Sequence, residues 1–542
     1  MAQTLNLSIV GASKKETKVI DSLDYSSSFE DFQSLQIEVT EFGKTLEQIG
    51  YIEQQLVSLK KENDSTFKAS FNLNRLYSII HLYNKALIPP KIIKRFNFDV
   101  QDDYIVMQIA NLESNLNLIN LEMANLGNPF SRLKLTDITK DEKGYLIADL
   151  ATSKREDRTV DNIIIKGYEK FPKSYLKHFL KIKTGQRFNL ASIKQKTEDL
   201  DNLQFANITR DPEVLFTSDS TTLYMYIEKN RSNTFDGFLG FGTNESTNNI
   251  EFDGYLDLRL NNNLNYGESL DLLYKSDEND QQTFNLSLRM PFVLSTPIGL
   301  EASLNIFRRD STFSTSRQTA KINYQISSRH LVSLGVQAEA STNLLDNNSI
   351  LINDYDSNRY FVNYQYLERQ NKNLLFPINF LFDISAGTGS RNVLEIKNDQ
   401  YNIEINTYKI FNLNARNSIY GRISGQYLDS NNYLENELPR FGGINSIRGF
   451  EENSLIANLY AVLNTEYRYK LSNSIYAHSV IDAAYFENKI TNQKEKLFGF
   501  GFGFGLVTQA GLFKFNYTSA KTENQPFRLS DSKIHISLTA LF

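Results

Sequence analysis

The side chains best placed to do chemistry lie near the end of the chain. His478 and Asp482 occur in a stretch whose alternate positions hold the apolar residues Ile481, Ala483 and Tyr485. In a β-strand, residues an even number apart share a face, so the two polar groups point the same way. A histidine oriented by a carboxylate is part of a hydrolase site. Because no nucleophile is identifiable beside the pair, we favour the interpretation that these groups form a structural polar lining.

No other arrangement in the sequence predicts catalysis or cofactor binding. The five histidines are scattered and lack the spacing of metal ligands. The chain has no cysteine, which excludes a disulfide framework and a thiolate site. No Gly-x-Ser-x-Gly segment occurs, and residues 11–15 (Gly-Ala-Ser-Lys-Lys) are interpreted as a turn after a strand rather than a phosphate loop. We therefore expect no enzyme activity, no metal and no cofactor.

The composition indicates short strands rather than membrane helices. Of 542 residues, 41% are hydrophobic, and no stretch approaches the length of a transmembrane helix. A strand of a membrane barrel needs only about 10 residues, with apolar side chains at alternate positions. The 29 tyrosines and 37 phenylalanines are enough to form aromatic girdles at both membrane surfaces. A net charge of −5 disfavours a general nucleic-acid binder.

From residue 234 onward, the sequence predicts sixteen antiparallel strands separated by turns rich in Asn, Asp, Ser and Gly. The alternation is clearest at 252–260, 284–290 and 498–505, the last of which repeats Phe-Gly four times. A soluble two-sheet protein has the same alternation. An even strand number with alternating short and long connections instead favours a transmembrane barrel over 231–542. The expected strands begin near Thr234, Ile250, Glu268, Thr283, Gly299, Ser314, His330, Ser357, Leu375, Gln400, Asn417, Asn458, Ser474, Leu497, Gly511 and Lys533.

Up to about residue 230, the chain alternates strand-like and helix-like segments and contains an internal repeat. Ile49, Leu126 and Leu203 each end a helical stretch, and they are 77 residues apart. The pattern predicts three α+β modules of β-α-α-β-β order, over 1–83, 84–152 and 153–230.

The third copy of the repeat is the clearest. It has an expected strand at 162–167, helices at 172–180 and 190–203, and a hairpin of 207–215 with 222–228. The first copy has expected strands at 5–9, 67–73 and 76–82. The second copy is degenerate: its first strand is not readable, and we expect helices within 105–126 and strands at 133–137 and 145–150.

Three segments resemble, in the same order, the signatures of the BamA/TamA superfamily of outer-membrane β-barrels. Residues 438–450 (Leu-Pro-Arg-Phe-Gly-Gly-Ile-Asn-Ser-Ile-Arg-Gly-Phe) resemble the sixth extracellular loop of that family. Residues 464–468 (Asn-Thr-Glu-Tyr-Arg) and 480–484 (Val-Ile-Asp-Ala-Ala) resemble two of its strands, with Ala484 where the family usually has glycine. The alternating apolar residues of 534–542 resemble its C-terminal insertion signal.

The N-terminal modules resemble the POTRA domains of the same family. The turn that contains Gly185, Phe188 and Asn189 carries this resemblance most clearly. Three such modules in series resemble TamA more than BamA, which usually has five. The resemblance implies POTRA modules in the periplasm followed by a sixteen-stranded barrel in the outer membrane of a Gram-negative cell. The start, Met1-Ala2-Gln3-Thr4, lacks the features of a signal peptide, and we expect that one has been removed.

The resemblance also implies that a loop of 430–456 folds back into the barrel lumen, with its tip at Ile447, Arg448, Gly449 and Phe450. Strand parity places Glu466 and Asp482 on the lumen side of their strands. We predict a lumen lock in which Arg448 pairs with one or both of these carboxylates. A partly desolvated guanidinium needs planar, bidentate acceptors, and lysine does not match that geometry.

The family mechanism implies a lateral seam, where strand one (234–242) closes the barrel against strand sixteen (533–542). An opened seam exposes strand edges that template an incoming β-strand, and no nucleotide is consumed. Gly237, Gly240 and Gly242 weaken strand one, and Leu538 and Phe542 are the candidate residues opposite. The expected partners are the lipid bilayer, unfolded clients bound along POTRA strand edges and a periplasmic or inner-membrane-anchored protein.

One alternative is a two-partner-secretion pore that passes an extended polypeptide through its lumen. Such a protein usually has two POTRA domains and an N-terminal plug helix, and neither is evident in this sequence. A second alternative, an enzyme with its site in the lumen, is disfavoured because no nucleophile is present.

Overall fold

The computed structural model describes residues 4–153, 157–243, 250–276, 281–345, 351–370, 373, 375–508, 511–524 and 532–541. Within these ranges, the side chains of 238–243, 250–254, 535 and 537–541 are not described. The chain forms two compact units. The first holds the residues up to 161 with 185–192 and 217–221, and the second holds the remainder. No helix in the described part is long and apolar enough to cross a membrane.

The first module is a four-stranded sheet in the order β2-β1-β4-β3, with β1 parallel to β4. Ser13 caps helix α1, and the Ser13 and Glu16 side chains each accept the other residue's backbone N–H. Along α2, every third or fourth residue is buried, as expected of a helix packed on a sheet. The elements are β1 (Leu5–Gly11), α1 (Lys14–Ile20), β2 (Ser28–Phe29), α2 (Phe32–Gln48), β3 (Gln55–Lys61) and β4 (Thr66–Asn72).

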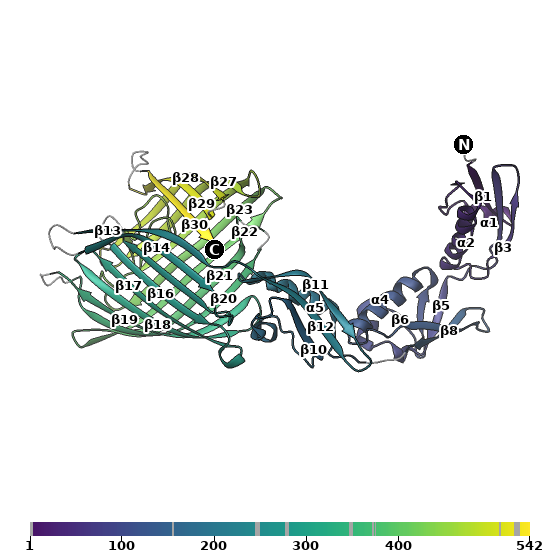
Figure 1. Cartoon of the computed structure of the whole chain (residues 1–542), viewed down its shortest axis with the longest axis horizontal. Helices are drawn as coiled ribbons and strands as arrows, with labels where there is room; N and C mark the ends of the chain where they lie inside the picture. The colour runs from purple at the N-terminus through teal and green to yellow at the C-terminus, as the bar shows by residue number, and fades with distance from the viewer. Residues whose placement is uncertain are drawn as a thin grey trace. The chain divides into compact units, whose positions relative to one another are not determined.

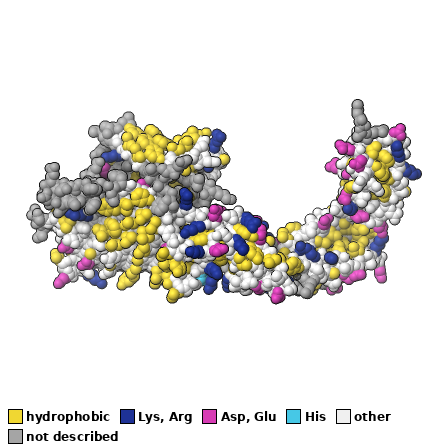
Figure 2. Space-filling model, viewed as in Figure 1, with side chains coloured by type: hydrophobic (Ala, Val, Ile, Leu, Met, Phe, Trp, Pro, Cys, Tyr) yellow, Lys and Arg dark blue, Asp and Glu magenta, His cyan; other side chains and the backbone are white. Residues whose placement is uncertain are grey.

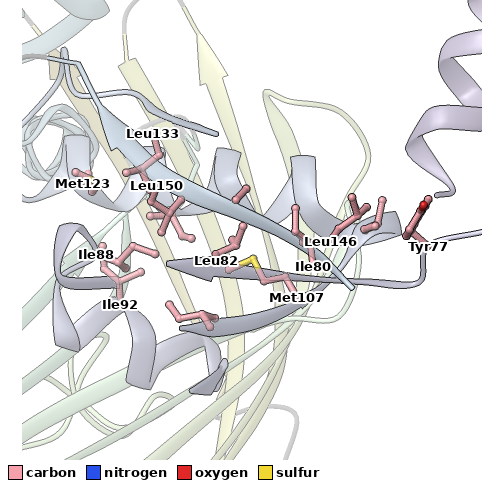
Figure 3. Close-up of a cluster of buried hydrophobic side chains, with 14 residues drawn as sticks. Tyr77, Ile80, Leu82, Ile88, Ile92, Met107, Met123, Leu133, Leu146 and Leu150 are labelled. Atoms are coloured by element: carbon pink, nitrogen blue, oxygen red, sulfur yellow. The ribbon is translucent and has the colours of Figure 1, made fainter. Parts of the chain in front are cut away.

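The second module is a five-stranded sheet in the order β6-β7-β5-β9-β8. Figure 3 shows its core, in which Leu82, Met107 and Leu150 lie between the sheet and the helices that bring Ile92 and Met123. The elements are β5 (Ile79–Tyr83), η1 (Lys85–Leu87), α3 (Pro90–Phe96), β6 (Asp99–Val100), β7 (Ile105–Gln108), η2 (Ile109–Asn111), α4 (Leu112–Asn125), β8 (Leu133–Lys140) and β9 (Leu146–Thr152).

The structure corrects two element predictions in these modules. The strand expected at 76–82 begins at Ile79 and pairs with β9, so it belongs to the second sheet and supplies the first strand that was not readable there. A module boundary before Ile79 fits this pairing better than one after residue 83. The segment Ile105–Gln108, expected to be helical, is β7, since β-branched residues such as Ile105 and Val106 favour a strand.

The third module is a three-stranded sheet in the order β10-β12-β11, with β10 parallel to β12. The predicted hairpin is present, and the second helix is shorter than expected because α5 ends at Glu198 and continues as the 3₁₀ segment η4. The first expected helix is a single π-helical turn, η3. The elements are β10 (Asn162–Gly167), η3 (Tyr175–Phe179), α5 (Leu190–Glu198), η4 (Asp199–Asn202), β11 (Ala206–Phe216) and β12 (Thr221–Lys229).

The second half is a closed antiparallel barrel of sixteen strands (Figure 1), which confirms the predicted fold class. Each strand begins within four residues of its predicted start. The strands are β13 (Thr234–Thr243), β14 (Ile250–Asn261), β15 (Ser269–Ser276), β16 (Gln281–Met290), β17 (Ile298–Arg309), β18 (Phe313–Gln325), β19 (His330–Asn343), β20 (Tyr355–Arg369), β21 (Ile378–Val393), β22 (Ile396–Asn412), β23 (Asn417–Ser430), β26 (Leu459–Lys470), β27 (Ile475–Asn488), β28 (Gln493–Thr508), β29 (Gly511–Thr522) and β30 (Lys533–Leu541).

The two faces of the barrel wall differ as the alternation predicts. On β26, Leu463 and Tyr467 are exposed on the outer face, while Asn464 and Glu466 between them are buried inside. Figure 2 shows hydrophobic side chains gathered over the barrel strands. An apolar outer wall around a polar interior is the pattern of a strand that faces lipid on one side.

Candidate functional site in the barrel lumen and seam

The loop between the eleventh and twelfth barrel strands, β23 and β26, is the predicted lumen loop. It contains a short antiparallel ladder of β24 (Arg440–Phe441) with β25 (Leu455–Ile456). This ladder joins the two ends of the loop tip, which comprises residues 442–454. Ile447 is fully buried, and Arg448 is only 5% exposed.

Arg448 contacts both carboxylates that the sequence indicated. Its Nη2 donates to Asp482 Oδ1 at 2.6 Å and its Nε to Oδ2 at 2.8 Å, which is a bidentate pair. Its Nη1 donates to Glu466 Oε1, and its backbone N–H donates to Asp482 Oδ2 at 3.1 Å. The other oxygen of Glu466 accepts from Arg468 Nε at 2.7 Å. Two arginines thus balance two carboxylates, which is the condition under which buried charges are tolerated.

Two glycines allow the loop tip to lie directly on the barrel wall. Gly449 has a φ of +93°, and a Cβ there would come within 2.9 Å of the backbone N of Ala520 on β29. A Cβ on Gly499 of β28 would lie 2.3 Å from the carbonyl oxygen of Arg448. The inward positions of the Phe-Gly repeat therefore leave space for the tip, while Phe500 and Phe502 face outward. The repeat was visible in the sequence, but nothing there linked it to the loop.

An apolar cluster formed by the same loop and strands lies next to the ion pairs. Phe441 stacks on Tyr460 with ring centroids 4.5 Å apart, and Ile447 packs among residues of β26 to β28. Phe450 is partly buried against the same cluster. The cluster consists of Phe441, Ile447, Ala457, Val462, Ala484, Phe486 and Leu497.

A second set of contacts, which we call the base anchor, fastens the start of the loop. Arg391 on β21 pairs with Glu437, and their side chains are only 1% and 4% exposed. Asn436 donates to Ser341 Oγ at 2.8 Å and to the Asn353 carbonyl at 2.9 Å. Sequence reasoning missed this anchor, because no local pattern connects residues that lie so far apart in the chain. The loop is thus held at its tip by β26 to β29 and at its base by β19 to β21.

The structure does not support the hydrolase pair. Asp482 forms an ion pair with Arg448, and His478 Nε2 contacts Asn516 Oδ1 at 2.9 Å instead of Asp482. The described residues contain no group of three or more His, Asp or Glu side chains that is suited to hold a metal ion.

The seam between β13 and β30 is paired at one end. In the described residues, Thr234 lies opposite Leu541 and Phe235 opposite Ala540. On the other side of β30, the register with β29 runs from Leu512 opposite Thr539 to Thr518 opposite Lys533. The paired end is where β13 begins, next to the third module. β30 is therefore held mainly by β29.

The structure places the predicted seam residues as follows. Gly237, Gly240 and Gly242 lie on β13, and Leu538 lies on β30, where it pairs with Phe513 of β29 rather than with β13. A Cβ on Gly237 would lie 2.3 Å from the Tyr255 carbonyl oxygen on β14, so this glycine serves close packing against β14. Phe542 lies outside the described residues.

The third module contacts the turns that connect the early barrel strands. Tyr168 donates from its hydroxyl to Asn265 Oδ1 at 2.5 Å, and Tyr175 donates to the Gly267 carbonyl at 3.2 Å. Asp199 accepts from the Ser328 hydroxyl at 2.7 Å. Sequence reasoning did not find these contacts, because each joins the module to a turn that carries no motif.

A family model of the Omp85 superfamily domain matches residues 258–538, more than half of the chain. The protein therefore belongs to the Omp85 superfamily, as the loop and strand motifs predicted. A second model, the POTRA surface antigen variable number repeat, matches residues 158–230. Members of the superfamily are outer-membrane transporters and assembly factors rather than enzymes, and this sets the general role of the chain.

Solved structures with the same architecture include two CdiB proteins. CdiB from Escherichia coli is 13% identical with a TM-score of 0.55, over 94% of this chain and 97% of that chain. CdiB from Acinetobacter baumannii is 16% identical with a TM-score of 0.54, over 94% and 98%. BamA from Haemophilus ducreyi lacking POTRA domains 1-3 is 14% identical with a TM-score of 0.48, over 84% and 98%. At these identities, the likeness concerns the fold alone. No curated protein matches the chain.

Proposed function

We propose that this protein inserts or assembles β-rich client polypeptides in the outer membrane, with its POTRA modules in the periplasm and its β13–β30 seam as the templating edge. One contrast carries the proposal. The lumen holds a loop fastened at tip and base, whereas the described seam is paired only near its periplasmic end. A plugged lumen and a weak seam favour a client path at the wall over a path through the pore.

The small sheets supply edges at which a client strand can add. β3, β8 and β11 each lie at the edge of their sheet, so in the described residues one side of each strand has no neighbouring strand and can accept another. On β3, Val57 is 64% exposed beside a register shift, and Leu215 on β11 is also exposed. An extended client strand gains main-chain hydrogen bonds and apolar contact at such an edge. The proposed partners are the bilayer, unfolded clients and a periplasmic or inner-membrane-anchored protein.

The alternative is a two-partner-secretion pore, and the CdiB neighbours are the reason to keep it. Three small sheets precede the barrel in this chain, whereas two POTRA domains are usual for such pores. In that mechanism the loop must leave the lumen for each transported chain, and the seam stays closed.

A disulfide across the seam separates the two mechanisms. The observed register makes Phe235→Cys with Ala540→Cys the natural pair, and the chain has no cysteine of its own. In proteoliposomes, we expect oxidation of this variant to abolish insertion of a β-barrel client and reduction to restore it. The matched control is Phe513→Cys with Leu538→Cys, which joins β30 to β29, its partner on the other side.

The control should insert clients at the same rate whether oxidised or reduced. Wild-type insertion by the oxidised seam variant would refute the lateral route. Transport of a soluble extended polypeptide by that same oxidised variant would favour the pore.

A further inference from the structure

Two adjacent glutamates just beyond the lock tip contact lysines on opposite sides of the seam. Glu451 Oε1 lies 2.9 Å from Lys533 Nζ, at the start of β30. Glu452 Oε2 lies 4.0 Å from Lys275 Nζ, on β15. We propose that Glu451 and Glu452 form a seam clamp, which holds the extracellular half of the β13–β30 seam closed from the lumen side. The inference rests on the proposed function, since it names a control on the same seam.

The clamp lies at the end of the seam where the described residues of β13 and β30 form no ladder pair. β13 starts and β30 ends at the periplasmic end, and the described pairs Thr234 with Leu541 and Phe235 with Ala540 lie there. Lys533 is the first residue of β30, at the opposite, extracellular end. In the described residues, no ladder pair joins β13 to this part of β30. In the described residues, the ion pair of Lys533 with Glu451 attaches this part of β30 to the loop.

Both lysines point into the lumen, where the loop can reach them. Ile534 and Ile536 are 61% and 64% exposed on the outer face of β30, so Lys533 lies on the inner face. On β15, Lys275 shares a face with Asp271 and lies opposite in parity to Leu272, which pairs with Leu286 on the apolar outer face. Two neighbouring side chains thus diverge from one loop to opposite sides of the seam: one reaches β30, which forms the seam, and the other reaches β15, two strands beyond β13.

The loop sequence leaves room for this acidic pair. Gly442 and Gly443 both have positive φ. A Cβ on Gly442 would lie 2.5 Å from the Glu451 carbonyl oxygen, and one on Gly443 would lie 2.7 Å from Glu452 Cδ. Gly442 and Gly443 therefore pack directly against the two glutamates. Since Arg448 fixes the tip three residues earlier, the lock positions the clamp.

The clamp is exposed enough to open and close readily. The Lys533 and Glu451 side chains are 39% and 58% exposed, and those of Lys275 and Glu452 are 37% and 29% exposed. Ion pairs this exposed are weak and are screened by salt. The buried Arg448 lock, in contrast, is shielded from salt. The buried pairs of Arg448 therefore hold the loop tip strongly, whereas the exposed ion pairs of the clamp break easily. A seam that opens to admit clients requires such weak contacts.

Spin labels on both sides of the seam test the clamp. Leu272→Cys on β15 and Ile534→Cys on β30 place labels on the outer face, and pulsed electron paramagnetic resonance gives the distance between them. In Glu451→Gln with Glu452→Gln, we expect a broader distribution shifted to longer distances, with the open fraction rising roughly two- to fivefold for each pair lost. Raising salt from about 0.05 M to about 0.5 M should open the wild type and leave this variant unchanged.

Charge exchange provides the specificity control. Glu451→Lys with Lys533→Glu should restore the wild-type distances, whereas Glu451→Lys alone should open the seam further. Glu395→Gln, which removes a carboxylate from the exposed turn between β21 and β22, should leave the distances unchanged. Unchanged protease resistance of residues 430–456 in every variant shows that the lock remains folded.

The outcomes for the clamp and for the proposed function are separate. An unchanged distance distribution in Glu451→Gln with Glu452→Gln overturns the clamp, whatever the insertion rate is. A longer distance with an unchanged rate of client insertion supports the clamp and refutes the seam as the client route. A longer distance with an altered insertion rate supports both.

Discussion

Asp482 accepts three hydrogen bonds from Arg448: from Nη2 at 2.6 Å, from Nε at 2.8 Å and from the backbone N–H at 3.1 Å. One carboxylate therefore fixes both the side chain and the backbone of the loop tip. Glu466 binds the remaining arm of the guanidinium. The backbone contact is independent of the side chain at position 448, which limits what a substitution there removes.

Arg448→Ala should release the loop tip. It leaves Asp482 and Glu466 buried without one of their cations, a change that costs about 3–5 kcal/mol in comparable buried pairs. Protease cleavage within 430–456 of detergent-folded protein should become faster. Arg448→Lys should restore only part of the resistance, since an ammonium cannot make the bidentate contact. Arg416→Ala, in an exposed turn, is the control. Equal cleavage of Arg448→Ala and wild type would contradict the lock.

Gly499→Ala should displace the tip without removing any charge. Its new Cβ would lie 2.3 Å from the Arg448 carbonyl oxygen, a backbone atom that cannot rotate away. We expect faster protease cleavage of the loop with an intact barrel. Gly421→Ala on β23 is the matched control, because a Cβ there meets no atom within 4 Å. Equal cleavage rates for the two alanine variants would show that the loop tip does not pack against Gly499.

The sequence predicted the barrel well because lipid imposes a regular pattern. Alternation, turn residues and strand number follow from a wall that is apolar outside and polar inside, and they need no knowledge of distant contacts. The contacts of Arg448 also followed, because the arginine and both carboxylates lie within short motifs. The sequence did not show which module contains β5, since only the pairing of β5 with β9 assigns it to the second module. The Arg391–Glu437 pair and the clamp lysines depend on how strands meet across the lumen.

The base anchor should behave as a second, separate fastening of the loop. Glu437→Gln leaves Arg391 with its side chain 1% exposed and without its carboxylate, which we expect to cost about 3–5 kcal/mol. Arg391→Gln with Glu437→Gln should be milder than either single change, because no unpaired charge remains. Hydrogen exchange of residues 431–440 measures the loss. Additive single effects in the double variant would show that the two side chains do not interact.

The third module should show a pH dependence that resides in Asp161. The Thr159 hydroxyl and the Thr221 backbone N–H, each at 2.7 Å, donate to its carboxylate and hold the pKa below the ordinary value of 3.8. A lowered folded-state pKa contributes stability above the unfolded value and loses it as the pH falls through the folded one. Protection of the Thr221 amide should therefore be constant from about pH 7 to about pH 5 and fall in stronger acid. Asp161→Asn should remove this dependence, and a steady loss of protection above pH 5 would contradict the assignment.

One of the contacts between the third module and the barrel depends on a glycine. Gly267 has a φ of +78°, and a Cβ there would lie 2.2 Å from the Tyr175 ring, whose hydroxyl donates to the Gly267 carbonyl. Gly185, with a φ of +77°, is a matched control for backbone strain, because a Cβ added there would meet no atom within 4 Å. Both alanine variants should lose about 1–2 kcal/mol for the left-handed backbone. Only Gly267→Ala should also expose the turn of 262–268 and Tyr175 to hydrogen exchange and proteolysis. Equal exposure in the two variants would mean that Tyr175 does not hold the module against this turn.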